Sequence, residues 1–147
     1  MFEKFNNLSK NKILLLDGAM GTMIQRLKLG ENDFKGENFK NWKKPLKGNN
    51  DILNLSKSNV IYDIHTEYLE SGSDILETNT FNSTKISQAD YGAEEFSYDL
   101  NYEGARLARK AVDDFLQRNP REVKFVAGVL GPTNRTCSMS PDVNDPG

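Results

Sequence analysis

The stretch that decides the fold is KILLLDGAMGTMIQRL, residues 12–27. An unbroken apolar run, 13–16, ends in the carboxylate of Asp17, and small residues occupy three of the next four positions. Such a run is typical of a parallel strand that is covered on both faces. The apolar spacing then becomes helical. The stretch therefore predicts a strand over 12–17 that ends in an acidic residue. Small residues follow it, so the backbone at the start of the next helix is not covered by side chains.

Composition is that of an ordinary globular domain. The chain has 147 residues, of which 37% are hydrophobic, and this is enough for one domain with a core. The net charge of −2 argues against binding to nucleic acid or to a membrane surface, because no field of one sign is available to hold phosphates. Five lysines between positions 35 and 47 form a local basic cluster, but Glu31, Asp33 and Glu37 are interleaved with it, so we expect a solvated surface segment.

No targeting or membrane segment is predicted. The first apolar run is shorter than the core of a signal peptide, and no run approaches the ~20 apolar residues of a membrane helix. The single cysteine, Cys137, cannot form an intrachain disulfide and has no neighbouring cysteine or histidine for a local zinc site. We therefore expect a soluble, cytoplasmic protein.

Strands and helices alternate along the chain. After the first strand, the apolar spacing predicts helices over 22–27, 59–71 and 96–118, a short helix within 83–91, and strands over 74–81 and 124–130. Residues 31–57 are predicted to form a long polar insertion. Strands that are separated by helices, without a hairpin signal, indicate a parallel α/β fold with right-handed crossovers.

Each predicted strand ends in a cluster of polar or small residues. The clusters read DGAMGT, ETNTFNST and GPTNRT. Parallel strands bring their carboxyl ends to the same side of a sheet, where α/β folds build their sites. The pattern therefore predicts a site for a small molecule on that side.

The first cluster matches the two charges of an amino acid. Asp17 offers an acceptor for an ammonium group, and the N–H groups near Gly18 and Ala19 can meet a carboxylate at the start of the helix. The alternative is that Asp17 only caps this helix. A dinucleotide site is disfavoured, because the glycines are spaced G-x-x-G and not G-x-G-x-x-G.

The second cluster leaves two interpretations open. Glu77 and Asn79 alternate onto one face of their strand, with Phe81 beyond them. Glu77 is either a ligand contact or a buried carboxylate with a basic partner. His65 has no second histidine or cysteine near it, and we expect an ordinary helix residue there.

Several long motifs carry a resemblance to a known family. These are LLLDGAMGTMIQRL, KGNNDILNLSKSNVI, LESGSDILETNTFNST, ADYGAEE, GARLARKA and FVAGVLGPTNRTCSMSPDVNDPG. In this order they resemble the amino-terminal homocysteine-binding module of cobalamin-dependent methionine synthase, in the homocysteine S-methyltransferase family. The resemblance extends from about Ile13 to Gly147.

The resemblance implies a (β/α)8 TIM barrel and a set of substrate-binding residues. The aspartate of the DGAMG motif would bind the substrate ammonium and the adjacent amides its carboxylate, which here are Asp17, Gly18 and Ala19. The same pocket would be lined by the strand-end residues Glu77, Asn79, Thr80 and Phe81. No catalytic residue and no metal ligand of the family is implied within this chain.

The implied reaction is methyl transfer from methylcobalamin, itself methylated by methyltetrahydrofolate, to homocysteine, which gives methionine. A free thiol with a pKa of about 8.5 is mostly protonated at neutral pH. The family solves this with a zinc ion held by three cysteines, which deprotonates the thiol. Those cysteines belong to later strands of the barrel, and Cys137 matches none of them.

The chain is therefore expected to be an incomplete barrel. A barrel of this kind needs eight strands and ~250 residues, whereas residues 1–147 contain about three predicted βα units. We expect a partial homocysteine-binding domain, inactive alone, whose partners are the rest of the barrel and the folate and cobalamin domains. Two alternatives stay open: a non-catalytic remnant or interaction protein, and a methyltransferase that uses betaine or S-methylmethionine.

Overall fold

The computed structural model describes residues 2–133. Its helices and strands follow in the order α1 (Phe2–Ser9), α2 (Met20–Arg26), α3 (Glu31–Lys35), η1 (Asn50–Ile52), α4 (Leu53–Ser56), α5 (Ser58–Glu70), β1 (Ile75–Glu77), α6 (Lys85–Gln88), η2 (Ala89–Tyr91), η3 (Glu94–Phe96), α7 (Ser97–Arg118) and β2 (Phe125–Ala127). Residues 134–147, which include Cys137 and the last residues of the GPTNRT cluster, lie outside the described residues. No helix within 2–133 is long and apolar enough to cross a membrane.

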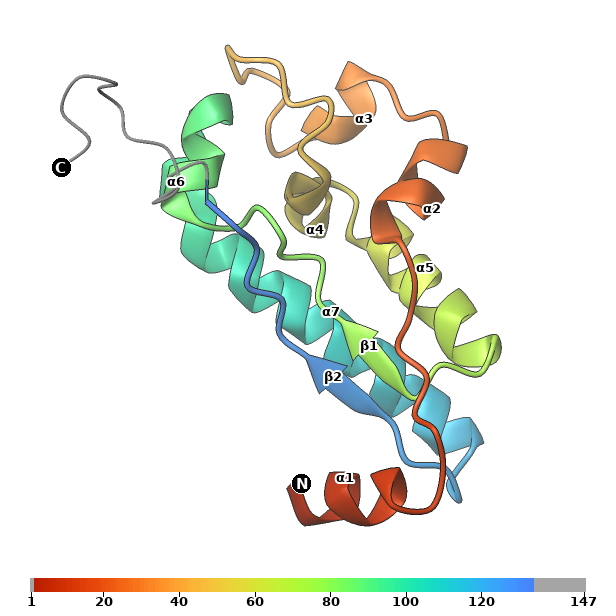
Figure 1. Ribbon diagram of the computed structural model, residues 1–147. Helices are drawn as coiled ribbons and strands as arrows, with labels where there is room; N and C mark the ends of the chain where they lie inside the picture. The colour runs from red at the N-terminus through yellow and green to blue at the C-terminus, as the bar shows by residue number, and fades with distance from the viewer. Residues whose placement is uncertain (1, 134–147) are drawn as a thin grey trace, which may run out of the picture.

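The sheet is parallel, as predicted. β1 and β2 pair with Ile75 opposite Phe125, and the chain before Asp17 runs along the other edge of β1 through a parallel bridge between Leu16 and Ile75. The Asp17 N–H donates to the Ile75 carbonyl at 2.9 Å. The first apolar run, β1 and β2 are therefore neighbours, and their carboxyl ends share one side (Figure 1).

The first predicted strand, 12–17, is wrong as a regular strand, because it is reduced to this single bridge. Ile13 is 87% exposed and Leu15 is 54% exposed, so the run is not covered on both faces. Its outer edge pairs with no other strand among the described residues, which leaves hydrogen bonds on one side only. Asp74 anchors it by accepting from the Lys12 Nζ at 2.7 Å and the Leu15 N–H at 3.1 Å.

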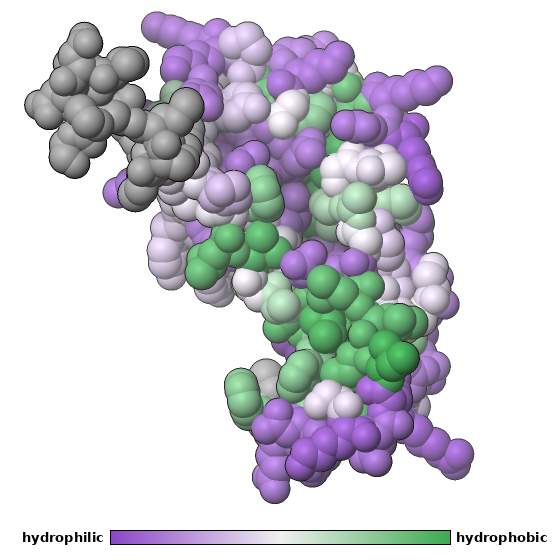
Figure 2. Space-filling view, viewed as in Figure 1, coloured by the Kyte–Doolittle hydropathy of each residue, from purple (hydrophilic) through white to green (hydrophobic). Residues whose placement is uncertain are grey.

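Helices α5 and α7 pack behind the sheet (Figure 1). The apolar spacing of residues 96–118 predicts a buried stripe, and the structure confirms it at Leu100, Leu107, Ala108, Ala111, Val112 and Phe115. Leu116, which the same spacing places in the stripe, is only partly buried. The face of β1 turned toward the viewer carries no helix, and apolar side chains gather on this side of the molecule in Figure 2. Helix α1, which was not predicted, covers the start of β2, where the Phe5 and Phe125 rings meet edge-on at 5.3 Å.

The predicted polar insertion, 31–57, is part of the core. It contains α3, η1 and α4, and its buried apolar side chains are Phe34, Phe39, Leu46, Ile52 and Leu53. These pack with Ile24, Ile61, Ile64 and Leu100 in one cluster. The sequence did not reveal this because the apolar residues of the segment are few and irregularly spaced, yet five of them are buried and Trp42 and Leu55 pack partly buried against the same cluster.

Candidate functional site

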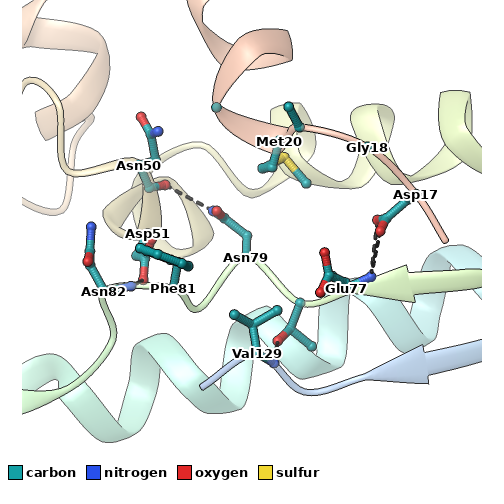
Figure 3. A pocket seen from close by; sticks show the side chains of 13 residues that line it. Asp17, Gly18, Met20, Asn50, Asp51, Glu77, Asn79, Phe81, Asn82 and Val129 are labelled. Atoms are coloured by element: carbon teal, nitrogen blue, oxygen red, sulfur yellow. Dashed lines mark hydrogen bonds between the residues drawn. The ribbon is translucent and has the colours of Figure 1, made fainter. Parts of the chain in front are cut away.

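A cleft of about 540 Å³ opens at the carboxyl ends of the first apolar run and of β1. Figure 3 shows Asp17 and Glu77 at one end of it and Asp51, Phe81 and Asn82 at the other. The first two predicted clusters, DGAMGT and ETNTFNST, supply lining residues. After β2 the lining residue is Val129, which precedes the predicted GPTNRT cluster; residues 131–133 of that cluster do not line the cleft, and residues 134–136 lie outside the described residues. The parallel sheet therefore assembles one site from distant parts of the sequence.

Asp17 faces the cleft and does not cap the helix that follows. Both of its carboxylate oxygens accept from the Glu77 N–H, at 3.0 and 3.1 Å, whereas Ala19 is the N-cap of α2 and no side chain bonds there. The capping alternative is therefore wrong. Burial raises the pKa of Asp17 from 3.8 to about 6, and the nearby Glu77 carboxylate adds to this rise, although the Glu77 N–H opposes it.

The backbone after Asp17 is open. Within the described residues, the N–H groups of Gly18 and Ala19 donate no hydrogen bond, and both residues are exposed and line the cleft. A Cβ at position 18 would lie 3.0 Å from the Tyr68 hydroxyl oxygen. Glycine is therefore the residue that lets this backbone pass Tyr68 and leaves its N–H groups free for an anion.

Glu77 and Asn79 both line the cleft, as their alternation predicts, but they differ in character. Glu77 is exposed and forms no ion pair within residues 2–133, so the alternative of a buried carboxylate with a basic partner is wrong. Asn79 is buried, and its Nδ2 donates to the Asn50 carbonyl at 3.0 Å and to the Asn54 Oδ1 at 3.1 Å.

Thr80 and Phe81 also differ. The Phe81 side chain is 54% exposed and lines the cleft. Thr80 is buried and is not among the lining residues, and its hydroxyl donates to the Val129 carbonyl at 2.9 Å. The Val129 N–H in turn donates to the Thr78 hydroxyl at 3.0 Å. Thr80 therefore does not face the cleft but links the segment after β1 to the segment after β2 through Val129.

Sequence reasoning missed one wall of the cleft. Asn50 and Asp51 lie in the supposed polar insertion, yet both line the cleft together with Asn82. Asp51 is 2% exposed, and its Oδ2 accepts from the Asn82 N–H and the Ser83 hydroxyl, each at 2.7 Å. Burial raises the pKa of Asp51 despite these bonds. The only signal was the run of three polar residues, 49–51, directly before an apolar one.

The charged side chains that line the cleft are all acidic: Asp17, Asp51 and Glu77. This arrangement favours a ligand with a cationic group, while among the described lining residues an anionic group meets backbone N–H groups, side-chain amides and the Thr78 hydroxyl. An amino acid has this combination of charges. The geometry thus agrees with the amino-acid site inferred from the first cluster.

The described residues do not fit a zinc ion. Among them no group of three or more histidine, cysteine or acidic side chains could hold a metal. His65 is fully buried within α5, and burial lowers its pKa to about 4, so it is neutral at physiological pH. Its ring nitrogens have no hydrogen-bond partner within the described residues.

Comparison with known proteins gives the class of the protein. The profile of the homocysteine S-methyltransferase family matches residues 14–146, and the chain therefore belongs to this family. The fold is similar to that of the homocysteine methyltransferase MmuM from Escherichia coli. Its metallated form is 28% identical with a TM-score of 0.67 over 86% of this chain. Its apo form is 26% identical with a TM-score of 0.60 over 89% of this chain.

The similarity covers a limited part of the solved enzyme. The chain spans 40% of the metallated MmuM chain and 41% of the apo chain. The α/β arrangement of the described residues is thus similar to that of about two fifths of this homocysteine methyltransferase.

Proposed function

We propose that this chain is the homocysteine-binding portion of a methionine synthase. In this proposal it forms about three βα units of a (β/α)8 barrel. The observation that carries the proposal is the juxtaposition of the Asp17 carboxylate with the unbonded N–H groups of Gly18 and Ala19 at the cleft. The family and the likeness to MmuM support homocysteine as the substrate.

The Asp17 carboxylate would bind the ammonium group of homocysteine, and the N–H groups of Gly18 and Ala19 would bind its carboxylate. Charge-assisted hydrogen bonds of this kind are the stronger ones, and they fix the orientation of the amino-acid end. Glu77 adds negative charge beside Asp17, and Phe81 supplies an apolar surface at the cleft. These residues bind and orient the substrate, and no step of methyl transfer is assigned to them.

Thiol activation and methyl donation lie, in this proposal, with other parts of the complete enzyme. Zinc would be held by cysteines of later barrel strands, and methylcobalamin would supply the methyl group. The remaining βα units would cover the apolar face of the sheet, where Leu15 and Leu16 are more than half exposed. A different donor, such as betaine or S-methylmethionine, would use the same homocysteine cleft.

The proposal is tested by amide NMR titration of the chain with L-homocysteine. Two analogues, mercaptopropylamine and mercaptobutanoate, lack the carboxylate and the ammonium group respectively. We expect saturable shifts at Gly18, Ala19 and Glu77 with homocysteine, and much weaker effects with either analogue. Asp17→Asn should weaken binding about tenfold or more, while Asp63→Asn, at an exposed position of α5, should leave it unchanged.

Two results would overturn the proposal. One is equal binding of homocysteine and mercaptobutanoate, since this would remove the ammonium–Asp17 contact. The other is unchanged affinity in Asp17→Asn. Zinc-dependent turnover by the 147-residue chain alone would contradict the assignment of activation to other parts of the enzyme.

A further inference from the structure

Three buried polar side chains tie residues 49–54 to the loop after β1. Asn49, Asp51 and Asn54 are 0%, 2% and 1% exposed, although they belong to a segment whose sequence reads as polar surface. Their partners Asn79, Asn82, Ser83 and Gln88 belong to the stretch 79–88, and Asn54 also donates to the Leu100 carbonyl of α7. This set of contacts is called the polar clamp below.

The first contact of the polar clamp is a reciprocal pair of amides. The Asn49 Nδ2 donates to the Gln88 Oε1 at 2.8 Å, and the Gln88 Nε2 donates to the Asn49 Oδ1 at 3.2 Å. The Gln88 Nε2 also donates to the Asn82 carbonyl at 2.9 Å. The Gln88 side chain therefore holds both Asn49, in the 31–57 segment, and the backbone of Asn82, which lines the cleft.

The second contact is also a reciprocal pair. The Asn54 Nδ2 donates to the Asn79 carbonyl at 2.8 Å and to the Leu100 carbonyl at 3.1 Å. The Asn79 Nδ2 returns a bond to the Asn54 Oδ1 at 3.1 Å. Asp51 forms the contact between these two pairs through the Asn82 N–H and the Ser83 hydroxyl.

Helix α7 leaves room for the clamp. A Cβ at Gly104 would lie 2.6 Å from the Thr80 Cγ2 and 2.9 Å from the Asn54 Nδ2. The absence of a side chain at this position allows the helix to approach both the clamp and the loop. The contacts thus depend on a close approach of three segments.

Burial of so many polar groups needs a reason beyond stability. A buried amide or carboxylate loses its water, and its hydrogen bonds mainly offset that loss. Apolar side chains of similar size would stabilise the same contact without directional bonds. Directional bonds fix the position of the backbone, and here they act on Asn79 and Asn82, which line the cleft.

We propose that the polar clamp positions the wall of the cleft opposite Asp17, so that Asn49, Asp51, Asn54 and Gln88 are positioning residues for the bound amino acid. The inference rests on the proposed homocysteine site. It gives the 49–54 segment a function in binding. The 49–54 segment fixes residues 79–82 at the distance from Asp17 that the ligand needs.

The test compares a single and a double variant. Gln88→Met leaves Asn49 buried without its partner, and should lower both stability and affinity. Asn49→Leu with Gln88→Met replaces the pair by apolar side chains, and such a replacement can be nearly neutral in stability. We expect the double variant to recover thermal stability, while the homocysteine Kd stays about tenfold weaker and the Asn82 amide exchanges its hydrogen faster than in the wild type.

A matched control separates positioning from general destabilisation. Val112→Ala removes buried apolar contacts in the second core cluster, with Leu76 and Phe115, and should lower stability without weakening homocysteine binding. Recovery of both affinity and amide protection in the double variant would overturn the inference. If the wild type itself binds no homocysteine, the proposed function fails. In that case the hydrogen-exchange rate of the Asn82 amide alone tests the positioning role of the polar clamp. If this rate in the double variant equals that in the wild type, the inference is overturned.

Discussion

Asp17→Asn is expected to stabilise the folded chain at neutral pH while it abolishes most of the ligand binding. Burial raises the pKa of the Asp17 carboxyl from 3.8 to about 6. No ion pair compensates its charge within the described residues, and its two oxygens share the N–H of Glu77. A carboxylate held in this way costs the free chain stability, and a bound ammonium group would relieve the cost.

The sign and size follow from proton linkage. The folded state binds the proton of Asp17 more tightly than the unfolded state, so this stabilisation is complete below pH 3.8 and is lost as the pH rises through about 6. A rise of about two pKa units corresponds to about 3 kcal/mol. Because Asp17 is only partly buried, solvent screening reduces the expected gain of Asp17→Asn at pH 7 to about 1 kcal/mol.

The assay is urea unfolding of the wild type and of Asp17→Asn between pH 4 and 7. The variant should be more stable at pH 7, and the difference should shrink toward zero near pH 4. Asp63→Asn, which removes an exposed carboxylate from α5, serves as the control and should show no such trend. A variant that is less stable than the wild type at pH 7, or a difference independent of pH, would refute the reasoning.

Three further changes test the loop after β1, the core contribution of the 31–57 segment and the ionisation of Asp74. Gly104→Ala should cost about 1–3 kcal/mol of unfolding free energy by crowding the loop after β1, whereas Gly128→Ala, where a Cβ meets nothing within 4 Å, should change it little; thermal melts compare the two. Leu46→Ala should cost about 2–5 kcal/mol in urea unfolding, because this fully buried insertion residue belongs to the core; an unchanged midpoint would contradict that. The pKa of Asp74 lies below 3.8: burial alone would raise it, but the hydrogen bonds from Lys12 and from the Leu15 N–H outweigh that effect. The stability that this carboxylate contributes is therefore lost as the pH falls below 3.8, and an acid titration of Asp74→Asn should lack that part of the loss.

Much of the fold was predictable because periodicity reports burial directly. The stripe of α7 and the order of parallel segments followed from apolar spacing. The first strand was overpredicted, since an apolar run shows that a segment avoids water but not whether a neighbour pairs with both edges. Ile13 is 87% exposed, and within residues 2–133 the run pairs with β1 through the single bridge of Leu16.

The candidate site was predictable on one side only. Asp17 stands at the end of an apolar run, and Glu77 and Asn79 alternate along a strand, so their shared edge followed from parallel topology. Asn50 and Asp51 carry no such signal. Their place at the cleft depends on partners about thirty residues away after β1: the Asn82 N–H donates to the buried Asp51 carboxylate, and the Asn79 side chain donates to the Asn50 carbonyl. A pattern of local spacing cannot reveal those contacts.

The most direct test of the central claim is a crystal structure of the chain with L-homocysteine. The account predicts that the ammonium group lies against the Asp17 carboxylate and that the substrate carboxylate accepts from the N–H groups of Gly18 and Ala19. Homocysteine bound elsewhere, or bound in the cleft with its carboxylate turned away from these N–H groups, would contradict it.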